Sequence, residues 1–543
     1  HLQGVQNFNV ADVTSSSATD LTISMRLDNP GTIGGAAGGI NKTGLGTMVL
    51  ANSNNSYQGT TRVTNGLLIA SVGGALPDLS TVEMADSATA ALQINATEQV
   101  GSLAGGGAAG GNIALGSGVV LITGNNGNSD TYGGVISGTG ASLLKVGGGN
   151  QTLTGNSTFT GGVTINAGTI TVPFVAASGT PQPLGTAGSA VTFAGAGSLV
   201  VTGSGTLDRG LVLANAANSM ETGGTVTQTG PITGGGSSAT FTKSGAGTFN
   251  QSGAGSWNSD VNVTAGTYNV TSTGSISGVG VVGLSGGSTM NIDTSTQVRA
   301  SSFNLSAGTL NLNAGTLRTN GITVAGGSAF GWGAGTLTMQ NANSGNSGST
   351  DRTGDNGSGG AASGPTIYEG TQLTIDNGIG NTVATSNGSV LDLGGLYTSG
   401  GLRYDQLRVT GTLNLDANDT LHVAINPYLL RPTSADSVAT GDWGTLVLVH
   451  ADTIIGQFNT ITGVSSDMIG WTQRATETDS GLLPSTLGLN EWMLEYRTGY
   501  GPLSGGDVLL LHYRVAGSVP EPASAGLLVA GALLLRALGR RKP

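Results

Sequence analysis

Three separate segments of this chain repeat one pattern of lysine, aromatic, aliphatic and glycine residues. Lys42, Lys145 and Lys243 each precede an aromatic residue by 14 or 15 positions. That aromatic residue precedes an aliphatic residue by six positions and a glycine by nine. Such a repeat constrains the fold strongly, because each copy is a structural unit that must stack on its neighbours. The equivalent positions are Tyr57, Phe159 and Trp257, then Val63, Ile165 and Val263, then Gly66, Gly168 and Gly266.

The sequence between the copies predicts short strands joined by tight turns. Thr, Val, Ile and Leu alternate with Ser, Asn and Gly, and 97 of the 543 residues are glycine. Strand residues that alternate in this way suit a sheet with one buried face, and glycine suits corners that need left-handed backbone angles. The pattern predicts an all-β fold, a parallel β-helix over residues 1–345 with roughly 20–25 residues per rung and strands about 4.8 Å apart. The lysines lie 103 and 98 residues apart, so several rungs separate the copies.

The repeat resembles the autotransporter-associated β-strand repeat, whose form is K-x-G-x-G-T, then aromatic-x-G, then V/I-x-x-G-T-L. The resemblance covers roughly residues 20–345. It implies a passenger-like parallel β-helix on a bacterial surface. We expect Tyr57, Phe159 and Trp257 to occupy equivalent corners and to pack in the core, with exposure for ligand stacking as the alternative.

The composition changes after a Ser- and Gly-rich stretch at residues 346–366, which we interpret as a loop or linker. Residues 367–517 are richer in leucine, aromatic residues and charge, and we interpret them as terminal rungs followed by a capping β region. A solenoid needs such a cap because unpaired strand edges aggregate. One small charged cluster lies in the linker and comprises Asp351, Arg352 and Asp355. A second lies after it and suggests an ordinary ion pair: Arg403, Asp405 and Arg408.

The last residues, 518–543, have the composition of a membrane stop. Pro520, Glu521 and Pro522 precede an apolar stretch at residues 523–538, and a basic end follows. The pattern predicts one C-terminal hydrophobic helix, short for a span of about 20 residues. Its basic flank would mark the cytoplasmic side, so the rest of the chain would lie outside the cytoplasm. The flank comprises Arg536, which can extend to the interface, and Arg540, Arg541 and Lys542.

This tail resembles the PEP-CTERM sorting signal of exported proteins in Gram-negative bacteria. The resemblance implies processing by an exosortase, with the chain transiently anchored in the inner membrane on its way to the envelope, cell surface or extracellular matrix. A permanent membrane anchor is the alternative. Because the chain starts at His1 with no signal peptide before it, we expect the true start to be missing.

No pattern in the sequence predicts a catalytic, metal or cofactor site. Cysteine is absent, which excludes disulfides and thiolate metal sites, and the net charge of −11 without a basic patch argues against nucleic-acid binding. His1, His422, His450 and His512 are the only histidines, and none forms a close metal-binding pair. The oxygen-rich segment 125–130 resembles a calcium loop, but a plain turn is the favoured interpretation. The glycine-rich segment 105–111 lacks the helix that a phosphate loop requires.

These observations favour an exported structural or adhesive protein rather than an enzyme. Its low charge and many Asn, Thr and Ser residues suit contact with extracellular polysaccharide through neutral hydrogen bonds. One alternative is a β-helix enzyme that cleaves polysaccharide, but such enzymes need clustered carboxylates and the acidic residues here are scattered. The other is an autotransporter passenger, which we disfavour because the chain ends in a basic apolar segment instead of membrane-spanning strands.

Overall fold

The computed structural model divides the chain into two units, His1–Leu337 and Thr338–Pro543, which we describe separately. In the first, which we call the coil, it describes all residues except 14, 17, 30–36, 320, 326–327 and 334. In the second it describes residues 338–339 and these stretches: 372–376, 382–384, 390–393, 397–398, 402–403, 406–415, 419–423, 443–458, 460–462, 472–480, 487, 491–499 and 506–514.

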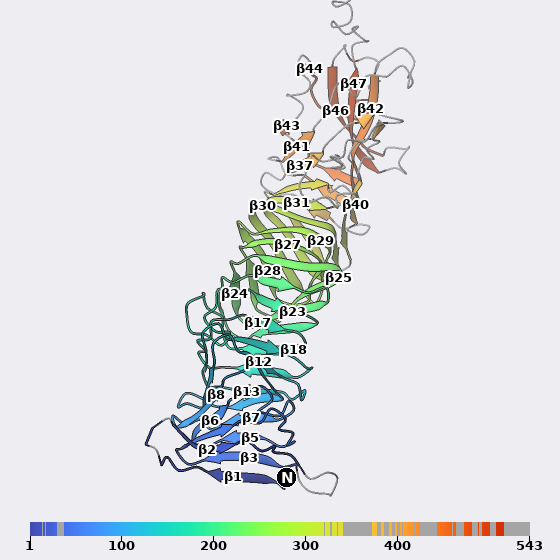
Figure 1. Cartoon of the computed structure of the whole chain (residues 1–543). Helices are drawn as coiled ribbons and strands as arrows, with labels where there is room; N and C mark the ends of the chain where they lie inside the picture. The colour runs from blue at the N-terminus through green and yellow to red at the C-terminus, as the bar shows by residue number, and fades with distance from the viewer. Residues whose placement is uncertain are drawn as a thin grey trace, which may run out of the picture. The chain divides into compact units, whose positions relative to one another are not determined.

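The coil is a parallel β-helix whose strands stack rung upon rung (Figure 1). Ile40 lies beside Thr61 and Thr61 beside Val82, a step of 21 residues per rung. Its N-terminal half has one sheet of six strands: β2 (Thr19–Ile23), β4 (Thr47–Leu50), β6 (Gly66–Ala70), β8 (Ala90–Ile94), β11 (Asn112–Leu115) and β14 (Ile136–Ser137).

The remaining strands of the coil's N-terminal half belong to the large sheet. They are β1 (Val5–Asn9), β3 (Gly39–Thr43), β5 (Thr61–Val63), β7 (Thr81–Met84), β9 (Glu98–Val100), β10 (Ser102–Gly105), β12 (Val120–Thr123), β13 (Asp130–Tyr132), β15 (Ser142–Lys145), β16 (Asn150–Leu153), β17 (Val163–Ile165), β18 (Gly168–Val172), β19 (Val191–Phe193) and β20 (Gly197–Val201).

The sheet continues through the C-terminal half, where several strands are longer. They are β21 (Gly205–Leu207), β22 (Leu211–Leu213), β23 (Ala217–Thr222), β24 (Thr225–Gln228), β25 (Ile232–Ser244), β26 (Thr248–Gln251), β27 (Ala254–Val263), β28 (Thr267–Ser272), β29 (Ser275–Leu284), β30 (Ser288–Leu305), β31 (Gly308–Thr319), β32 (Gly321–Val324) and β33 (Ala329–Trp332), followed by β34 (Thr336–Met339) at the unit boundary.

The alternation of apolar and polar residues in the sequence places successive side chains in the core and on the outer face of the coil. In β20, Leu199 and Val201 are fully buried, while the intervening residues are half-buried on the outer face. Stacking such strands in register fills a narrow core with aliphatic side chains from every rung. The expected all-β parallel β-helix is therefore confirmed.

The aromatic residues of the repeat lie in that core. Tyr57, Phe159 and Trp257 are each at most 2% exposed, which confirms the prediction of core packing and leaves no face for ligand stacking. Trp257 packs against Phe241 with ring centroids 6.2 Å apart. Aromatic neighbours at this separation add to the stability that burial already supplies.

One rung of the coil carries an insertion held by a buried arginine. Val163 lies beside Val191, a step of 28 residues, whereas Leu143 lies beside Val163 after 20. Arg209 is 1% exposed and donates to the carbonyl oxygens of Leu184 and Gly185, at 3.1 and 2.9 Å. The guanidinium thus satisfies carbonyls that the extra residues would leave buried without donors.

The second unit begins with parallel strands and ends with antiparallel ones. The parallel ladders join β35 (Gln372–Asp376) and β36 (Thr382–Ala384) to β40 (Gln406–Asn414). They also join β37 (Val390–Leu393) to β41 (Thr420–Val423), and β41 to β43 (Thr460–Thr462). A small hairpin pairs β38 (Tyr397–Thr398) with β39 (Leu402–Arg403). Two short strands, β44 (Thr472–Gln473) and β45 (Glu477–Thr478), lie parallel to β46 (Glu491–Arg497).

We call the antiparallel part of this unit the cap sheet. In it β47 (Asp507–Arg514) pairs antiparallel with both β42 (Trp443–Ile455) and β46. The five central residues of β46 and the six of β47 are all buried, so both faces of these strands are covered.

The predicted C-terminal helix lies outside the described residues, together with Pro520, Glu521, Pro522 and the basic flank. So does the predicted linker at 346–366. The described residues contain no helix, and hence none with the length and hydropathy of a membrane span.

Candidate functional sites: buried charges in the coil and the cap sheet

The lysine of the repeat is buried at a corner of the coil and bonds only to backbone. Lys145 has no exposed surface, and its Nζ donates to the carbonyl oxygens of Val146, Gly147 and Ala167 at 2.7, 2.9 and 3.3 Å. Two of these carbonyls follow the lysine directly, and the third belongs to the next rung. The ammonium therefore ties one corner to the corner stacked on it.

The same corner forms at the other two copies of the repeat. Each lysine lies beside the aliphatic residue of its own pattern in the next strand: Lys42 beside Val63, Lys145 beside Ile165 and Lys243 beside Val263. The repeat therefore spans one rung and the corner above it. The other acceptors are the carbonyls of Thr43, Gly44 and Asn65 at 2.8–3.1 Å from Lys42 Nζ, and of Gly245, Gly247 and Ala265 at 2.7–2.9 Å from Lys243 Nζ.

The last glycine of the pattern is required by this corner. Gly168 has a φ of +67°, and a Cβ there would lie 2.4 Å from the Gly147 carbonyl oxygen and 2.8 Å from Lys145 Nζ. Glycine alone adopts such angles without strain and leaves room for the ammonium. Gly66 and Gly266 have φ values of +72° and +65° and equally close neighbours.

These lysines stabilise the fold and do not present a reactive group. Burial lowers the pKa of Lys145 to about 8, and the same cause lowers those of Lys42 and Lys243 to about 8. The negative charges of Asp20 and Glu221 oppose that shift of the pKa at Lys42 and Lys243. A side chain with no exposed surface and all three of its N–H groups engaged offers nothing to a substrate.

Glu98 is the acidic counterpart of the lysine corners. It is 1% exposed, and its Oε1 accepts a hydrogen bond from the backbone N–H of Leu76 at 2.8 Å. Burial raises the pKa of Glu98 to about 7, although backbone N–H groups of residues 74–76 oppose the shift. Its Oε2 has no hydrogen-bond partner, which suits a carboxyl that is protonated near neutral pH.

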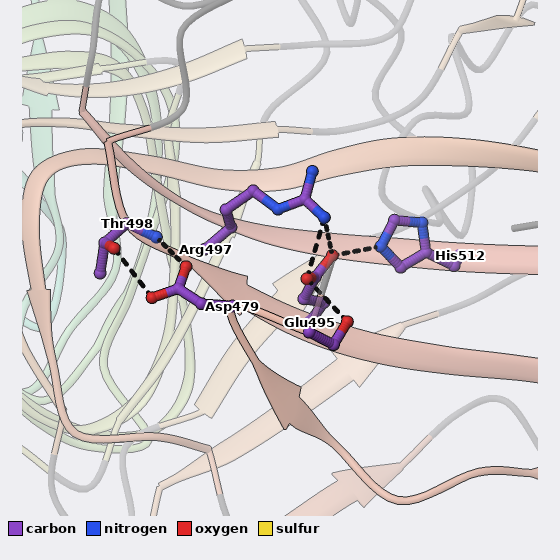
Figure 2. Close-up of polar contacts among 6 residues, drawn as sticks. Asp479, Glu495, Arg497, Thr498 and His512 are labelled. Atoms are coloured by element: carbon purple, nitrogen blue, oxygen red, sulfur yellow. Dashed lines mark hydrogen bonds and ion pairs between the residues drawn. The ribbon is translucent and has the colours of Figure 1, made fainter. Parts of the chain in front are cut away.

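The cap sheet contains a buried cluster centred on Glu495 (Figure 2). One carboxylate oxygen lies 2.7 Å from His512 Nε2, and the other accepts from the Ser480 hydroxyl at 2.8 Å. Arg497 Nη2 donates to both oxygens at 3.0 and 2.9 Å. Glu495 and His512 are at most 2% exposed. Burial raises the pKa of Glu495, but the bonds from His512, Ser480 and Arg497 outweigh it and hold the pKa below its usual value.

A second carboxylate beside this cluster secures a turn. Asp479, with a φ of +45°, accepts hydrogen bonds from the backbone N–H and the hydroxyl of Thr498 at 2.8 and 2.9 Å (Figure 2). This bond joins the end of β46 to the segment after β45. Since the Glu495 and Asp479 carboxylates are both engaged by the chain's own donors, the cluster has the arrangement of a structural network rather than of a hydrolytic pair.

The four histidines of the sequence belong to different segments of the chain. His1 lies 2.5 Å from Asp28 at the start of the coil. His422 and His450 lie in β41 and β42 of the second unit, and His512 lies in β47 beside Glu495. Among the described residues no group of three His, Asp or Glu residues is placed to hold a metal ion.

Two polar segments that resemble ligand loops bond to the chain itself. In the segment 125–130, Asn126 Nδ2 donates to the hydroxyls of Thr81 and Ser102 at 3.1 Å, and Asp130 accepts from Ser102 at 2.6 Å. In the segment 105–111, the N–H groups of residues 109 and 110 donate to Asp86 Oδ1 at 2.7 and 3.1 Å. Inter-rung hydrogen bonding therefore uses several polar groups of both segments.

The charged clusters predicted for the second half of the chain fall partly or wholly outside the described residues. Asp351, Arg352 and Asp355 are outside, as is Asp405, while Arg403 and Arg408 lie in β39 and β40. Sequence reasoning missed Glu98 and Glu495. Glu98 had a usable signal, because the alternation of β9 places it on the inward side with Val100.

Comparison with known proteins places the repeat in a described family. The model of the passenger-associated-transport-repeat family matches residues 40–70 and 143–172, two stretches that each contain a lysine corner. Over 222 residues, 39% of this chain, the sequence is 38% identical to the adhesin BmaC autotransporter of Brucella suis biovar 1 (strain 1330). The matched segment is 6% of that protein's length. No solved structure matches the chain. The chain thus carries a passenger-type repeat and is homologous to a small part of a much longer adhesin.

Proposed function

We propose that this chain forms the rod of an exported adhesive protein at the bacterial surface. The observation that carries the proposal is the 222-residue similarity to an adhesin. The fold suits the role, because a stack of rungs extends far while each rung contacts only its neighbours. The repeat family and this relative favour an autotransporter passenger, the alternative that the C-terminal sequence had led us to disfavour.

Adhesion is tested by displaying the coil on cells that do not adhere. Cells that present residues 1–339 should bind to host or abiotic surfaces more than cells presenting a similar length of an unrelated β-solenoid. Equal binding by the two displayed proteins, at equal surface density by antibody staining, contradicts the adhesive role.

The route to the surface is a separate proposal, which rests on Pro520, Glu521 and Pro522 and on the basic flank of the apolar stretch. An exosortase-type enzyme recognises this tail, and the apolar segment anchors the chain in the inner membrane until it is processed. Deleting residues 520–543 should move the protein from the envelope to another fraction. An unchanged distribution between membrane and medium contradicts sorting through the tail, and it leaves the adhesive role of the rod untouched.

The enzymatic alternative has less support. The buried carboxylates Glu98 and Glu495 are bonded by the chain's own backbone or side chains, and the homologous protein is an adhesin. Incubation of the purified chain with neutral and acidic polysaccharides, followed by measurement of new reducing ends, tests it. Release of reducing ends that a matched Glu-to-Gln variant loses would overturn the non-enzymatic interpretation.

A further inference from the structure

The outer face of one sheet in the coil repeats the same two residue types over five rungs. Strands β24, β26, β28, β30 and β31 lie side by side in register. We call the two rows that run across them the Thr–Asn track. One row is Thr225, Thr248, Thr267, Thr289 and Thr309, and the row two residues further along the strands is Thr227, Asn250, Asn269, Asn291 and Asn311.

The asparagines of the track are held in one orientation by each other. Asn269 donates to Asn250, Asn291 to Asn269 and Asn311 to Asn291, each from Nδ2 to Oδ1 at 2.8 Å. An amide has two N–H donors and two oxygen lone pairs, and this ladder uses one of each. The side chains on both rows are half-buried or exposed, so the second donor and the second lone pair can face solvent.

The track has definite ends. In the next rung Ala329 and Gly331 of β33 take the places of Thr309 and Asn311. A Cβ at Gly331 would lie 2.6 Å from Asn311 Oδ1, so a side chain there would have to displace the last amide. At the other end β24 pairs with the three-residue strand β21, in which Thr206 lies beside Thr227 but no residue of β21 pairs with Thr225, so the first row ends there. The repetition is therefore a local feature of five rungs rather than a property of the whole coil.

The chemistry of the track selects among possible partners. The two rows contain no charged residue, which excludes an ionic partner as the main source of affinity. Their outward side chains also include no aromatic, methionine or arginine, the residues that are enriched in protein–protein interfaces. A polymer rich in hydroxyl groups matches them, because each hydroxyl both donates and accepts, as the threonine hydroxyls and asparagine amides do.

We propose that the Thr–Asn track binds an extended neutral polysaccharide whose chain lies along the axis of the coil. Successive rungs are about 4.8 Å apart, close to the length of one sugar unit in an extended glycan, so neighbouring units meet equivalent threonine and asparagine groups. Each contact is weak, but several rungs engaging one chain raise the overall affinity through their effective concentration. This inference names the ligand of the adhesive rod and so rests on the proposed function.

The test measures retention of the purified full-length chain in native gels that contain a neutral glucan or galactomannan. The triple variant Thr267→Val, Thr289→Val and Thr309→Val removes three hydroxyls but keeps the β-branched shape and the asparagine ladder. Its matched control is Thr164→Val, Thr192→Val and Thr242→Val, at half-buried outward positions of β17, β19 and β25. We expect the track variant to bind at least about tenfold more weakly because several contacts are lost at once, and the control to bind like the parent.

Each contrary result has a definite meaning. Equal retention of the track variant and the parent overturns the proposal, as does retention that disappears at high salt, which would show ionic binding. Sedimentation that shows the track variant losing self-association would assign the face to a second copy and overturn it too. Cells that adhere although the purified rod binds no neutral glycan would remove the track inference and leave the adhesive function. Glycan binding without cell adhesion would contradict the adhesive function and leave the track inference.

Discussion

The coil and the cap sheet provide hydrogen-bond partners for buried ionisable side chains in two different ways. In the coil, Lys145 donates to three carbonyls and Glu98 accepts from backbone N–H groups, so the partners belong to the backbone. In the cap sheet, the partners of Glu495 are the side chains of His512, Arg497 and Ser480. The direction of the strands explains the difference.

Parallel rungs bring equivalent corners directly above one another, so carbonyls or N–H groups of two rungs converge where the chain turns. One long side chain from the strand can satisfy several of them. Within paired strands of either direction the backbone groups already bond across the ladder, so in the cap sheet it is side chains from neighbouring strands that meet. Met493 lies opposite His512 and Leu510 opposite Glu495, so His512 and Glu495 form a diagonal pair within reach of each other. A buried side chain that bonds to backbone groups can recur in many rungs, because every rung has those groups. A network of side chains forms only where its particular residues meet.

The largest effect should follow removal of the central acid of the cap sheet. Glu495→Ala removes the buried carboxylate that His512 and Arg497 share, and breaking a buried pair from one side costs about 3–5 kcal/mol. Hydrogen exchange of β46 and β47 should accelerate strongly, while amides of the coil keep their protection. Ser480→Ala, which removes one donor, is the milder control. Equal loss of protection in both units would show that the cap sheet is not stabilised locally by this network.

The acid buried in the coil predicts a dependence of stability on pH. The pKa of Glu98 rises from 4.5 when unfolded to about 7 when folded, so the folded chain holds an extra proton between these values. The stabilisation is full below pH 4.5 and is lost as pH rises to 7, to an extent of about 3 kcal/mol. Glu98→Gln should remove this dependence. Thermal unfolding of parent and variant at pH 5 and pH 8 measures it, and identical pH profiles would contradict a protonated Glu98.

The lysine corners should respond alike despite their distance in sequence. Lys145→Met keeps much of the side-chain volume but leaves three carbonyls without a donor, at a cost of about 2 kcal/mol. Lys42→Met and Lys243→Met should cost similar amounts, as judged by hydrogen exchange of the two strands that each corner joins. Costs that differ severalfold, or a corner variant that is more stable than the parent, would show that the ammonium is not what ties the rungs together.

The sequence predicted the coil well because the spacing of the repeat and the alternation of apolar and polar residues are visible in the order of the residues. The burial of Tyr57, Phe159 and Trp257 followed from that pattern. The role of Lys145 did not, because its acceptor at Ala167 is 22 residues away and is a backbone atom, which carries no mark in the sequence. Glu495 was missed for a related reason. The antiparallel register of β46 and β47 brings His512 close to Glu495, and no sequence motif predicts that register.

The smallest expected effect separates the side-chain hydrogen bonds of the coil from its hydrophobic packing. The Tyr57 hydroxyl lies 2.6 Å from Thr61 Oγ1, which also lies 2.9 Å from the Ser80 hydroxyl. Tyr57→Phe keeps the ring in the core and removes one bond of this chain, while Thr61 retains Ser80, so the loss should be about 1 kcal/mol. The reverse change at the equivalent position, Phe159→Tyr, should cost more, because it buries a hydroxyl in a fully buried site that is filled by a phenyl ring. Urea unfolding of the two variants measures their free energies of unfolding. If Tyr57→Phe lowered the free energy more than Phe159→Tyr, side-chain hydrogen bonds would contribute more to the coil than its packing does. The coil would then resemble the cap sheet in relying on bonds between side chains.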